Sequence, residues 1–224
     1  MISAYTISRE PVEWKMKEIP HLNLDKPEVK ANVYEKPYEY VKELSEKRNL
    51  AVTALLEKYP GTSLVLCCDS SYVNQTEALQ RLIYDYQVDP WERILGGAIW
   101  GRQIMRAKDV FFHRKPRWCD GWGVPELIPL EYEDYKSRTD SQRVKSVSGI
   151  HIFPRTAWDQ GVRYGAYEDT DRGTETSYFA HHAIGIPSYI DFAARFFRER
   201  VYSTLKCFHV SIGLRSRLKG RMRS

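Results

Sequence analysis

Acidic side chains and one late histidine stand at the ends of the elements that the sequence predicts. Asp69 directly follows the apolar run at residues 64–68, and Glu175 opens a predicted helix. Asp169 lies in a loop bracketed by glycines, and His209 follows two apolar residues. Carboxylate oxygens suit Mg²⁺ or Mn²⁺, and an imidazole ligand favours Mn²⁺. We therefore predict that these groups converge on a cation that could neutralise a diphosphate leaving group.

Each of these residues also has a purely structural interpretation. An acid at a helix start, such as Glu175, is often there only because it interacts favourably with the helix dipole. A lone histidine such as His209 is more often structural than a ligand, and His181 and His182 indicate surface or packing positions. Asp69 is harder to explain in this way, because burying a carboxylate is costly unless a cleft or a cation accompanies it. Asp69 is therefore the anchor of the functional hypothesis.

The run before Asp69 also indicates the class of fold. Five consecutive apolar residues at 64–68 are typical of a strand buried on both faces of a parallel sheet. Ligands of such sheets bind outside the carboxyl ends of the strands, where Asp69 would emerge. Strands and helices alternate over residues 1–90, which predicts a doubly wound α/β sheet. The predicted elements are strands at 2–7, 29–34 and 64–68, a helix start at Ser8–Pro11, a helix at 37–56 with a possible break near Ser45, and a helix at 76–87.

The second half of the chain has a different pattern. Residues 91–135 are rich in tryptophan, glycine and proline, which favours shorter strands and loops. The later elements are predicted as a buried strand at 146–153, a short helix through Trp158, a helix at 174–184 and a strand-helix element within 187–197. Because no linker separates the halves, we expect one domain made of residues 1–90 and 91–212, followed by a tail at 213–224.

The charge is concentrated in that tail. The chain of 224 residues has a formal net charge of +5, and five basic residues without an acid lie between Arg215 and Arg223. The rest of the chain is nearly neutral, so no nucleic-acid partner is expected. The tail could contact an anionic membrane or could simply be solvated.

The cysteines and the hydropathy pattern bear on the compartment. The four cysteines include no C-x-x-C pair, which favours reduced thiols inside the cell. No apolar stretch approaches the roughly 18 residues of a membrane span, and no signal segment opens the chain. We predict a soluble, cytoplasmic protein, with peripheral membrane contact through the tail as the alternative.

The order of motifs over residues 2–212 resembles that of nucleotide-sugar-dependent glycosyltransferases of the A-type fold, most closely the large inverting family. The matching motifs are Thr6, Arg48-Asn49, Asp69-Ser70-Ser71, Ser148-Gly149, Thr174-Glu175-Thr176 and His209. The resemblance implies a single mixed sheet with a nucleotide-sugar half and an acceptor half. It also implies sugar transfer from a nucleoside-diphosphate sugar to a hydroxyl of a glycan, a lipid-linked acceptor or a protein, assisted by Mn²⁺ or Mg²⁺.

The resemblance assigns roles to individual residues. Tyr5, Thr6, Arg48 and Asn49 would face the nucleotide, and Asp69 would bind the ribose or the metal. Gly149 would lie between donor and acceptor, and His209 would complete the metal site. The general base would be Glu175, with Asp169 as the second choice.

One departure from the family pattern leaves other functions open. Ser71 stands where the second acid of the D-x-D motif would be, so the metal ligands are incomplete or different. A nucleotide-binding regulatory protein that has lost transfer activity is therefore an alternative. A nucleic-acid-binding protein, suggested by the basic tail and the many aromatic residues, is a further one.

Overall fold

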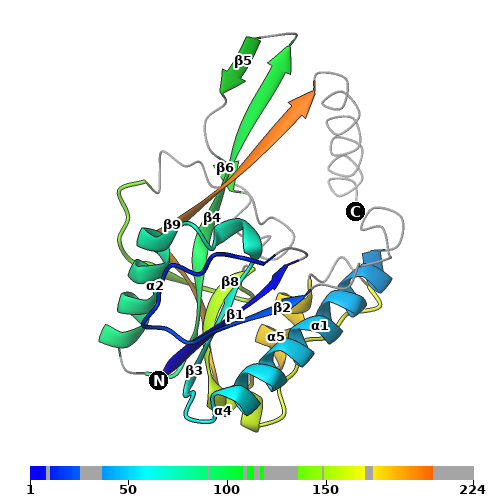
Figure 1. Cartoon of the computed structure of the whole chain (residues 1–224), viewed down its shortest axis with the longest axis vertical. Helices are drawn as coiled ribbons and strands as arrows, with labels where there is room; N and C mark the ends of the chain where they lie inside the picture. Colours follow the sequence, from blue (N-terminus) through cyan, green and yellow to red (C-terminus); the bar gives the residue numbers. More distant parts are fainter. Residues whose placement is uncertain are drawn as a thin grey trace.

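A computed structural model of the chain describes residues 1–8, 11–25, 37–89, 91–107, 110–113, 117–118, 136–147, 149–169 and 174–203. Its centre is one mixed β-sheet with helices on both faces, which confirms the predicted α/β class (Figure 1). Along the sheet the strands follow the order β2–β1–β3–β8–β4–β9–β7, and β5 and β6 pair with β4. The strands are β1 Ile2–Ser8, β2 His21–Asp25, β3 Leu64–Cys68, β4 Ile94–Ala107, β5 Val110–His113, β6 Arg117–Trp118, β7 Ser141–Val144, β8 Ile150–Pro154 and β9 Ser188–Ser203.

Five strands of this sheet share one direction. β1 runs parallel to β2 and β3, and β4 runs parallel to β9. β8 is antiparallel to both β3 and β4, so these two point the same way, while β7 is antiparallel to β9. The β3–β8 pairing joins the two halves predicted from the sequence into one continuous sheet. It also places the start of β8 beside the carboxyl end of β3.

Helices cover the two faces of the sheet separately. The helices are α1 Pro37–Lys58, η1 Ser70–Tyr72 (a 3₁₀ helix), α2 Thr76–Val88, α4 Arg155–Asp159 and α5 Glu175–His182. On one face, α1, α4 and α5 pack over a core that includes Leu55, Phe153 and Phe179. On the other, η1 and α2 pack over a core that includes Leu79 and Phe196. This two-sided cover is the arrangement that the buried β3 strand predicted.

The central elements agree with the sequence. The predicted strand at 64–68 is β3, and the helices predicted at 37–56, 76–87 and 174–184 are α1, α2 and α5. The break suggested near Ser45 is wrong, because α1 is continuous there. The Ser45 hydroxyl donates to the Val41 carbonyl one turn earlier (2.7 Å), so its polar group is satisfied within the helix.

The segment after β1 differs from the prediction. Residues 11–20 form a loop and turn instead of a helix. The Trp14 indole donates to the carbonyl of Met16 (2.9 Å) and to that of Ile19 (3.1 Å). It also stacks on His21, with ring centroids 4.4 Å apart. The chain then enters β2, and the strand predicted at 29–34 lies outside the described residues.

The second half contains short strands as expected, such as β5 and β6, together with two long strands that were not predicted. β4 has 14 residues, and β9, with 16 residues, is continuous strand where a strand-helix element was expected. Their register is interrupted once, between Gly97 and Ala98, and then continues to Arg106. Figure 1 shows β4 and β9 extending together beyond the helical layers toward β5. We call this extension the arm, defined as residues 98–107 of β4 and 195–203 of β9.

Two predictions concern the periphery of the molecule. Within the described residues, no helix has the length and apolar character needed to cross a membrane. The basic tail at 213–224 lies outside the described residues, so its contact with a membrane stays a prediction.

Candidate functional site

The candidate site lies at the edge of the sheet where β3 ends and β8 begins. Asp69 follows β3 directly, and Gly149 precedes β8. These two residues are neighbours because Cys68 is the register partner of Ile150 in the antiparallel β3–β8 pair. Carboxyl ends of parallel strands are the usual place for a ligand of an α/β sheet. The predicted position of Asp69 at this edge is therefore confirmed.

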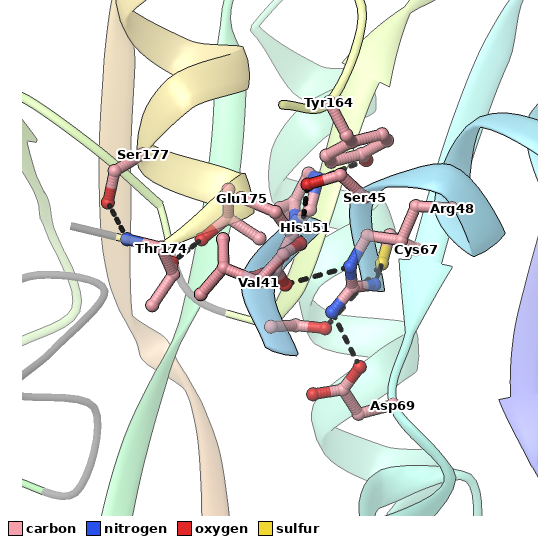
Figure 2. A network of polar contacts seen from close by, with 12 residues as sticks. Val41, Ser45, Arg48, Cys67, Asp69, His151, Tyr164, Thr174, Glu175 and Ser177 are labelled. Atoms are coloured by element: carbon pink, nitrogen blue, oxygen red, sulfur yellow. Dashed lines mark hydrogen bonds and ion pairs between the residues drawn. The ribbon is translucent and has the colours of Figure 1, made fainter. Parts of the chain in front are cut away.

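Arg48 of α1 forms ion pairs with two acids of this site. Its guanidinium donates from Nη2 to Asp69 Oδ1 (3.0 Å) and from Nε to Glu175 Oε1 (2.9 Å). Nη1 donates to the Cys67 sulfur. Figure 2 shows the Arg48 side chain between the two carboxylates. The sequence singled out Arg48, Asp69 and Glu175 separately, and the structure joins them through ion pairs.

The two carboxylates of this cluster differ in exposure. The side chains of Arg48 and Glu175 are only 3% and 6% exposed, whereas that of Asp69 is 43% exposed. Burial opposes the charge of Arg48, but nearby Cys67, Asp69 and Glu175 outweigh that effect and raise the pKa of Arg48 well above its ordinary value. Arg48 is thus a permanent internal cation, and Asp69 is the acid of the cluster that a ligand can reach.

Gly149 leaves room for the Asp69 carboxylate. A Cβ atom added at Gly149 would overlap Oδ2 of Asp69, so no larger residue fits without displacing that acid. Ser70 and Ser71 continue into the short helix η1 and are exposed. Neighbouring Ser148 lies outside the described residues. The site therefore offers one acid and two exposed hydroxyls where the D-x-D pattern would offer two acids.

A buried polar chain lies behind Arg48. The Tyr5 hydroxyl donates to the Tyr164 hydroxyl (3.2 Å), which lies 2.8 Å from His151 Nε2. Burial raises the pKa of Cys67 to about 12 and raises those of Tyr5 and Tyr164 well above their ordinary values. The Cys67 thiol and the hydroxyls of Tyr5 and Tyr164 are therefore neutral at pH 7. Tyr5, expected to face a nucleotide, instead belongs to the core.

Two other residues expected to face the nucleotide also have internal partners. The Asn49 amide donates to the Tyr164 carbonyl and accepts from the Tyr164 N–H, both at 2.9 Å. Thr6 is buried, and its hydroxyl lies 2.9 Å from His21 Nε2. Asn49 thus holds the loop after α4, and Thr6 helps to order the loop before β2. Neither directs its polar atoms to the Asp69 edge.

The start of α5 fixes Glu175. Thr174 caps the helix reciprocally with Ser177, and the Thr176 hydroxyl donates to the Val147 carbonyl (2.7 Å). These contacts attach the helix start to the segment before β8. Asp169, the alternative base, is exposed on the loop that leads toward α5. The structure joins Glu175 to Asp69 through Arg48.

Tyr40 and Arg198 lie near the same edge and were not predicted. Tyr40 is half-buried in the first turn of α1, two helical turns before Arg48. Burial and the charges of Glu175 and Asp69 raise the pKa of Tyr40, while Arg48 and Arg198 oppose that rise. The same four charges therefore act on the Tyr40 hydroxyl. The i, i+8 spacing from Arg48 is a signal that could have identified Tyr40.

The described residues do not make up a cation site by themselves. Within them, no group of three or more His, Cys, Asp and Glu side chains converges as metal ligands. One oxygen of Asp69 is already bound by Arg48, and Mg²⁺ prefers near-ideal octahedral oxygen coordination. His209 lies outside the described residues, so its part in a metal site stays a prediction.

Comparison with known proteins gives no family assignment. Neither protein-family models nor curated proteins match this chain. The case for a function therefore rests on the geometry of the site and on the motif order in the sequence.

Proposed function

We propose that the chain binds a nucleoside-diphosphate sugar at the Asp69 edge and transfers the sugar to an acceptor hydroxyl. The observation that carries the proposal is the exposed Asp69 carboxylate, held by buried Arg48 at the carboxyl end of a central strand. A carboxylate fixed in this way can accept two hydrogen bonds from a ribose diol while its position stays constant. The mixed sheet, with β8 reversed between β3 and β4, agrees with the fold that the motif order implies.

A positive charge for the diphosphate is available on β9. Arg198 is exposed and follows Phe197, whose N–H and carbonyl are both bonded to the Gln75 side chain at 2.8 Å. Gln75 lies six residues after Asp69, so these contacts hold β9 beside the Asp69 turn. A guanidinium binds phosphate oxygens in a bidentate manner. In this proposal Arg198 neutralises charge that develops on the leaving diphosphate.

The general base is best sought at Asp169. A base must reach the acceptor hydroxyl within hydrogen-bond distance. Glu175 is buried and gives one oxygen to Arg48, whereas Asp169 is exposed. This geometry reverses the order of preference derived from the sequence. In the proposed reaction the base removes the acceptor proton while the sugar carbon-oxygen bond to the diphosphate breaks on the opposite side.

Ligand binding is the first test. Wild-type protein is melted with each common nucleoside diphosphate, with and without Mn²⁺, since a ligand of the native state raises the Tm. We expect at least one nucleotide to raise the Tm, and Asp69→Ala to abolish that rise. Asp159→Ala is the matched control, because Asp159 is an exposed acid paired with Arg155 on α4. No Tm rise with any nucleotide, or an equal loss in both variants, contradicts the proposal.

Sugar transfer is the second test. Labelled nucleotide sugars are incubated with the protein, and release of the nucleoside diphosphate is measured with water or a sugar as acceptor. Asp69→Ala and Arg198→Gln are expected to lower turnover, and Asp169→Asn to lower it about 10²- to 10⁴-fold, as loss of a general base does. Turnover that survives in Asp69→Ala would remove the central residue of the proposal.

A binding protein without transfer activity is the second candidate. The observation that favours it is the burial of Glu175 against Arg48, which withdraws one predicted base from the site. It predicts nucleotide-dependent stabilisation that Asp69→Ala removes, together with no release of nucleotide from any donor. The two tests above therefore distinguish the candidates.

A further inference from the structure

A second buried acid, Asp191, lies in β9 where the arm begins. The residue is 2% exposed. Its Oδ1 accepts the N–H of Ala193 (2.8 Å). Its Oδ2 is buried and has no hydrogen-bond donor among the described residues. An orphaned carboxylate oxygen of this kind is costly, so its protonation state needs an explanation.

The position of Asp191 coincides with the only register shift recorded between β4 and β9 in the described residues. Asp191 is the partner of Gly97, and the next matched pair is Ala98 with Arg195. Residues 192–194 therefore form a bulge, and Asp191 Oδ1 binds an amide inside it. Bulges bend a strand and change its direction. Asp191 thus stabilises the turn of the chain from which β9 enters the arm.

Asp85 of α2 provides the missing partner. The Asp85 carboxyl is, after burial, the next cause of the raised pKa of Asp191 and lies within its hydrogen-bonding reach. Two carboxyl groups can hydrogen-bond only when one of them carries a proton. Arg81 donates to Asp85 one helical turn away, so Asp85 is the acid of the two that has a cation beside it. The proton therefore resides on Asp191, and the orphaned oxygen becomes a donor.

Two cations lie close to this pair: Arg81 forms an ion pair with Asp85, and Arg93 donates to the Asp85 backbone carbonyl (2.8 Å). Burial, followed by the hydrogen bond to Asp85, raises the pKa of Asp191 to about 7. From α2, the charged neighbours are Arg81 and Asp85. Before β7, Arg138 and Asp140 pair with each other. Arg195 of β9 donates to the carbonyls of Phe192 and Arg138, and the register partners of Asp191 on β4 and β7, Gly97 and Ser141, carry no charge.

We propose that Asp85 and Asp191 share one proton and form a pH-sensitive latch that holds α2 against the β9 bulge. Loss of the proton puts two negative charges at one buried contact and weakens it. The proton that leaves goes to solvent, and no other bond changes.

Helix α2 connects the latch to the Asp69 edge. α2 is attached to β9 at both ends, by Asp85 near its C-terminus and by Gln75 just before its first residue. The Asp69 turn immediately precedes Gln75. Opening of the latch would loosen the contact between the C-terminal part of α2 and the β9 bulge, while Gln75 and the core contacts of Leu82 and Tyr86 remain. The proposal concerns protonation and packing, so it stands or fails independently of nucleotide or sugar binding.

Carboxyl NMR tests the protonation directly. The ¹³C shift of the Asp191 side-chain carboxyl is followed from pH 4 to pH 9 in the full chain, with assignment by comparison with Asp191→Asn. We expect a titration midpoint near 7. A midpoint near the ordinary value for aspartate, about 4, overturns the proposal.

Unfolding experiments test the contact. In Asp191→Asn, the amide keeps an oxygen for Ala193 and donates to Asp85 at every pH. Wild type holds the proton in the native state and loses it in the unfolded state above pH 4. The unfolding constant of wild type relative to this variant is therefore expected to rise with pH, by up to about tenfold per unit between pH 4 and 7. Asp89→Asn, an exposed acid after α2 that pairs with Arg93, is the control and should give no such trend. A ratio for Asp191→Asn that stays constant with pH contradicts the latch.

Hydrogen exchange tests the location. Raising the pH from 6 to 8 is expected to lower the protection factors of Ala193 and of amides in the last turns of α2 in wild type, after correction for intrinsic rates. Asp191→Asn should keep them constant. Equal losses in both proteins would show that the opening does not depend on Asp191.

Discussion

Glu175 and Asp191 are both nearly fully buried carboxyl groups, on opposite faces of one sheet, and they have opposite partners. Glu175 lies against the guanidinium of Arg48 on the α1 face. Asp191 lies against the acid Asp85 on the α2 face. Burial is similar for the two groups, but Glu175 has a cation as its partner and Asp191 has a second acid. Arg48, whose pKa is raised well above its ordinary value, stays charged, whereas Asp191, whose pKa burial raises to about 7, changes charge within the physiological range.

The exposed member of each cluster differs as well. At the Arg48 side, Asp69 is the exposed group, and it is held in place by a buried cation. At the Asp191 side, the exposed member is the cation Arg81, whose side chain is 44% exposed. A fixed acid is suited to ligand binding, whereas an exposed cation beside one partly buried and one buried acid is suited to modest tuning of protonation. The predictions below test this contrast.

Removal of the buried cation should have the largest effect. Arg48→Met leaves Glu175 buried without a partner, and loss of one member of a buried ion pair costs about 3–5 kcal/mol. The free energy of unfolding, measured in urea at pH 7, should fall by that amount. The double variant Arg48→Met/Glu175→Gln should recover part of the loss, because the uncompensated charge is gone. A loss below about 1 kcal/mol in the single variant, typical of exposed pairs, would contradict the assigned burial.

The next largest loss of stability should come from removing the side-chain amides of Asn49 and Gln75, which we call the two amide clamps. Asn49→Ala and Gln75→Ala each remove two hydrogen bonds to a backbone unit, at Tyr164 and at Phe197 respectively. Each buried group left unsatisfied costs about 1–3 kcal/mol, and we expect a loss in that range for each variant. Hydrogen exchange should separate them, since Asn49→Ala exposes the Tyr164 amide and Gln75→Ala exposes the Phe197 amide. Identical exchange patterns would show that the clamps do not act locally.

Much of the fold follows from local patterns in the sequence. Five apolar residues before Asp69 predicted β3, and helical spacing predicted α1 and α2. The loop before β2 was missed because Trp14 folds onto His21, a contact with no periodic signal. In β2, Leu22 and Leu24 alternate with polar residues, a strand pattern that was passed over. The pairing of β4 with β9 could not be predicted, because it joins segments about ninety residues apart.

The site was predicted residue by residue but not as a network. Asp69, Glu175 and Arg48 were named from element ends and a motif, with a cation expected to join the acids. The structure joins them through an arginine instead, and residue spacing does not reveal which side chains pair across the sheet. Asp191 interrupts the apolar run at residues 189–194, the same signal that drew attention to Asp69. Applied to both halves, that signal would have identified both acid clusters.

The pH dependence of stability should separate Asp191 from His21. Burial and nearby Lys58 lower the pKa of His21 to about 4, so His21 stabilises the fold above its unfolded pKa and loses this contribution as the pH falls through 6.5 toward 4. Asp191 stabilises the fold at acid pH and loses its contribution as the pH rises from 4 to 7. Between pH 4 and 6.5 the two residues change the free energy of unfolding in opposite directions. Each contributes a slope of up to about 1.4 kcal/mol per pH unit.

Single substitutions should reveal the two slopes. Relative to wild type, His21→Gln should become less stable as the pH rises from 4.5 to 6.5, because only the Asp191 contribution remains. Asp191→Asn should change in the opposite direction over the same interval. Chemical unfolding at half-unit steps of pH measures both. If the stabilities of the two variants relative to wild type changed in the same direction with pH, the charge states assigned to these residues would be contradicted.

The exposed cation over the acid pair should have the smallest effect on stability. Arg81→Met removes a salt bridge that is open to solvent, and such pairs contribute about 0–1 kcal/mol. The same change should raise the pKa of Asp191 further, because the second negative charge of the pair then forms without a cation beside it. Carboxyl NMR measures that shift, and urea unfolding measures the stability. If Arg81→Met lowered the free energy of unfolding as much as Arg48→Met, the difference in exposure would not distinguish the two clusters. If it left the Asp191 midpoint unchanged, Arg81 would not be the group that assigns the shared proton to Asp191.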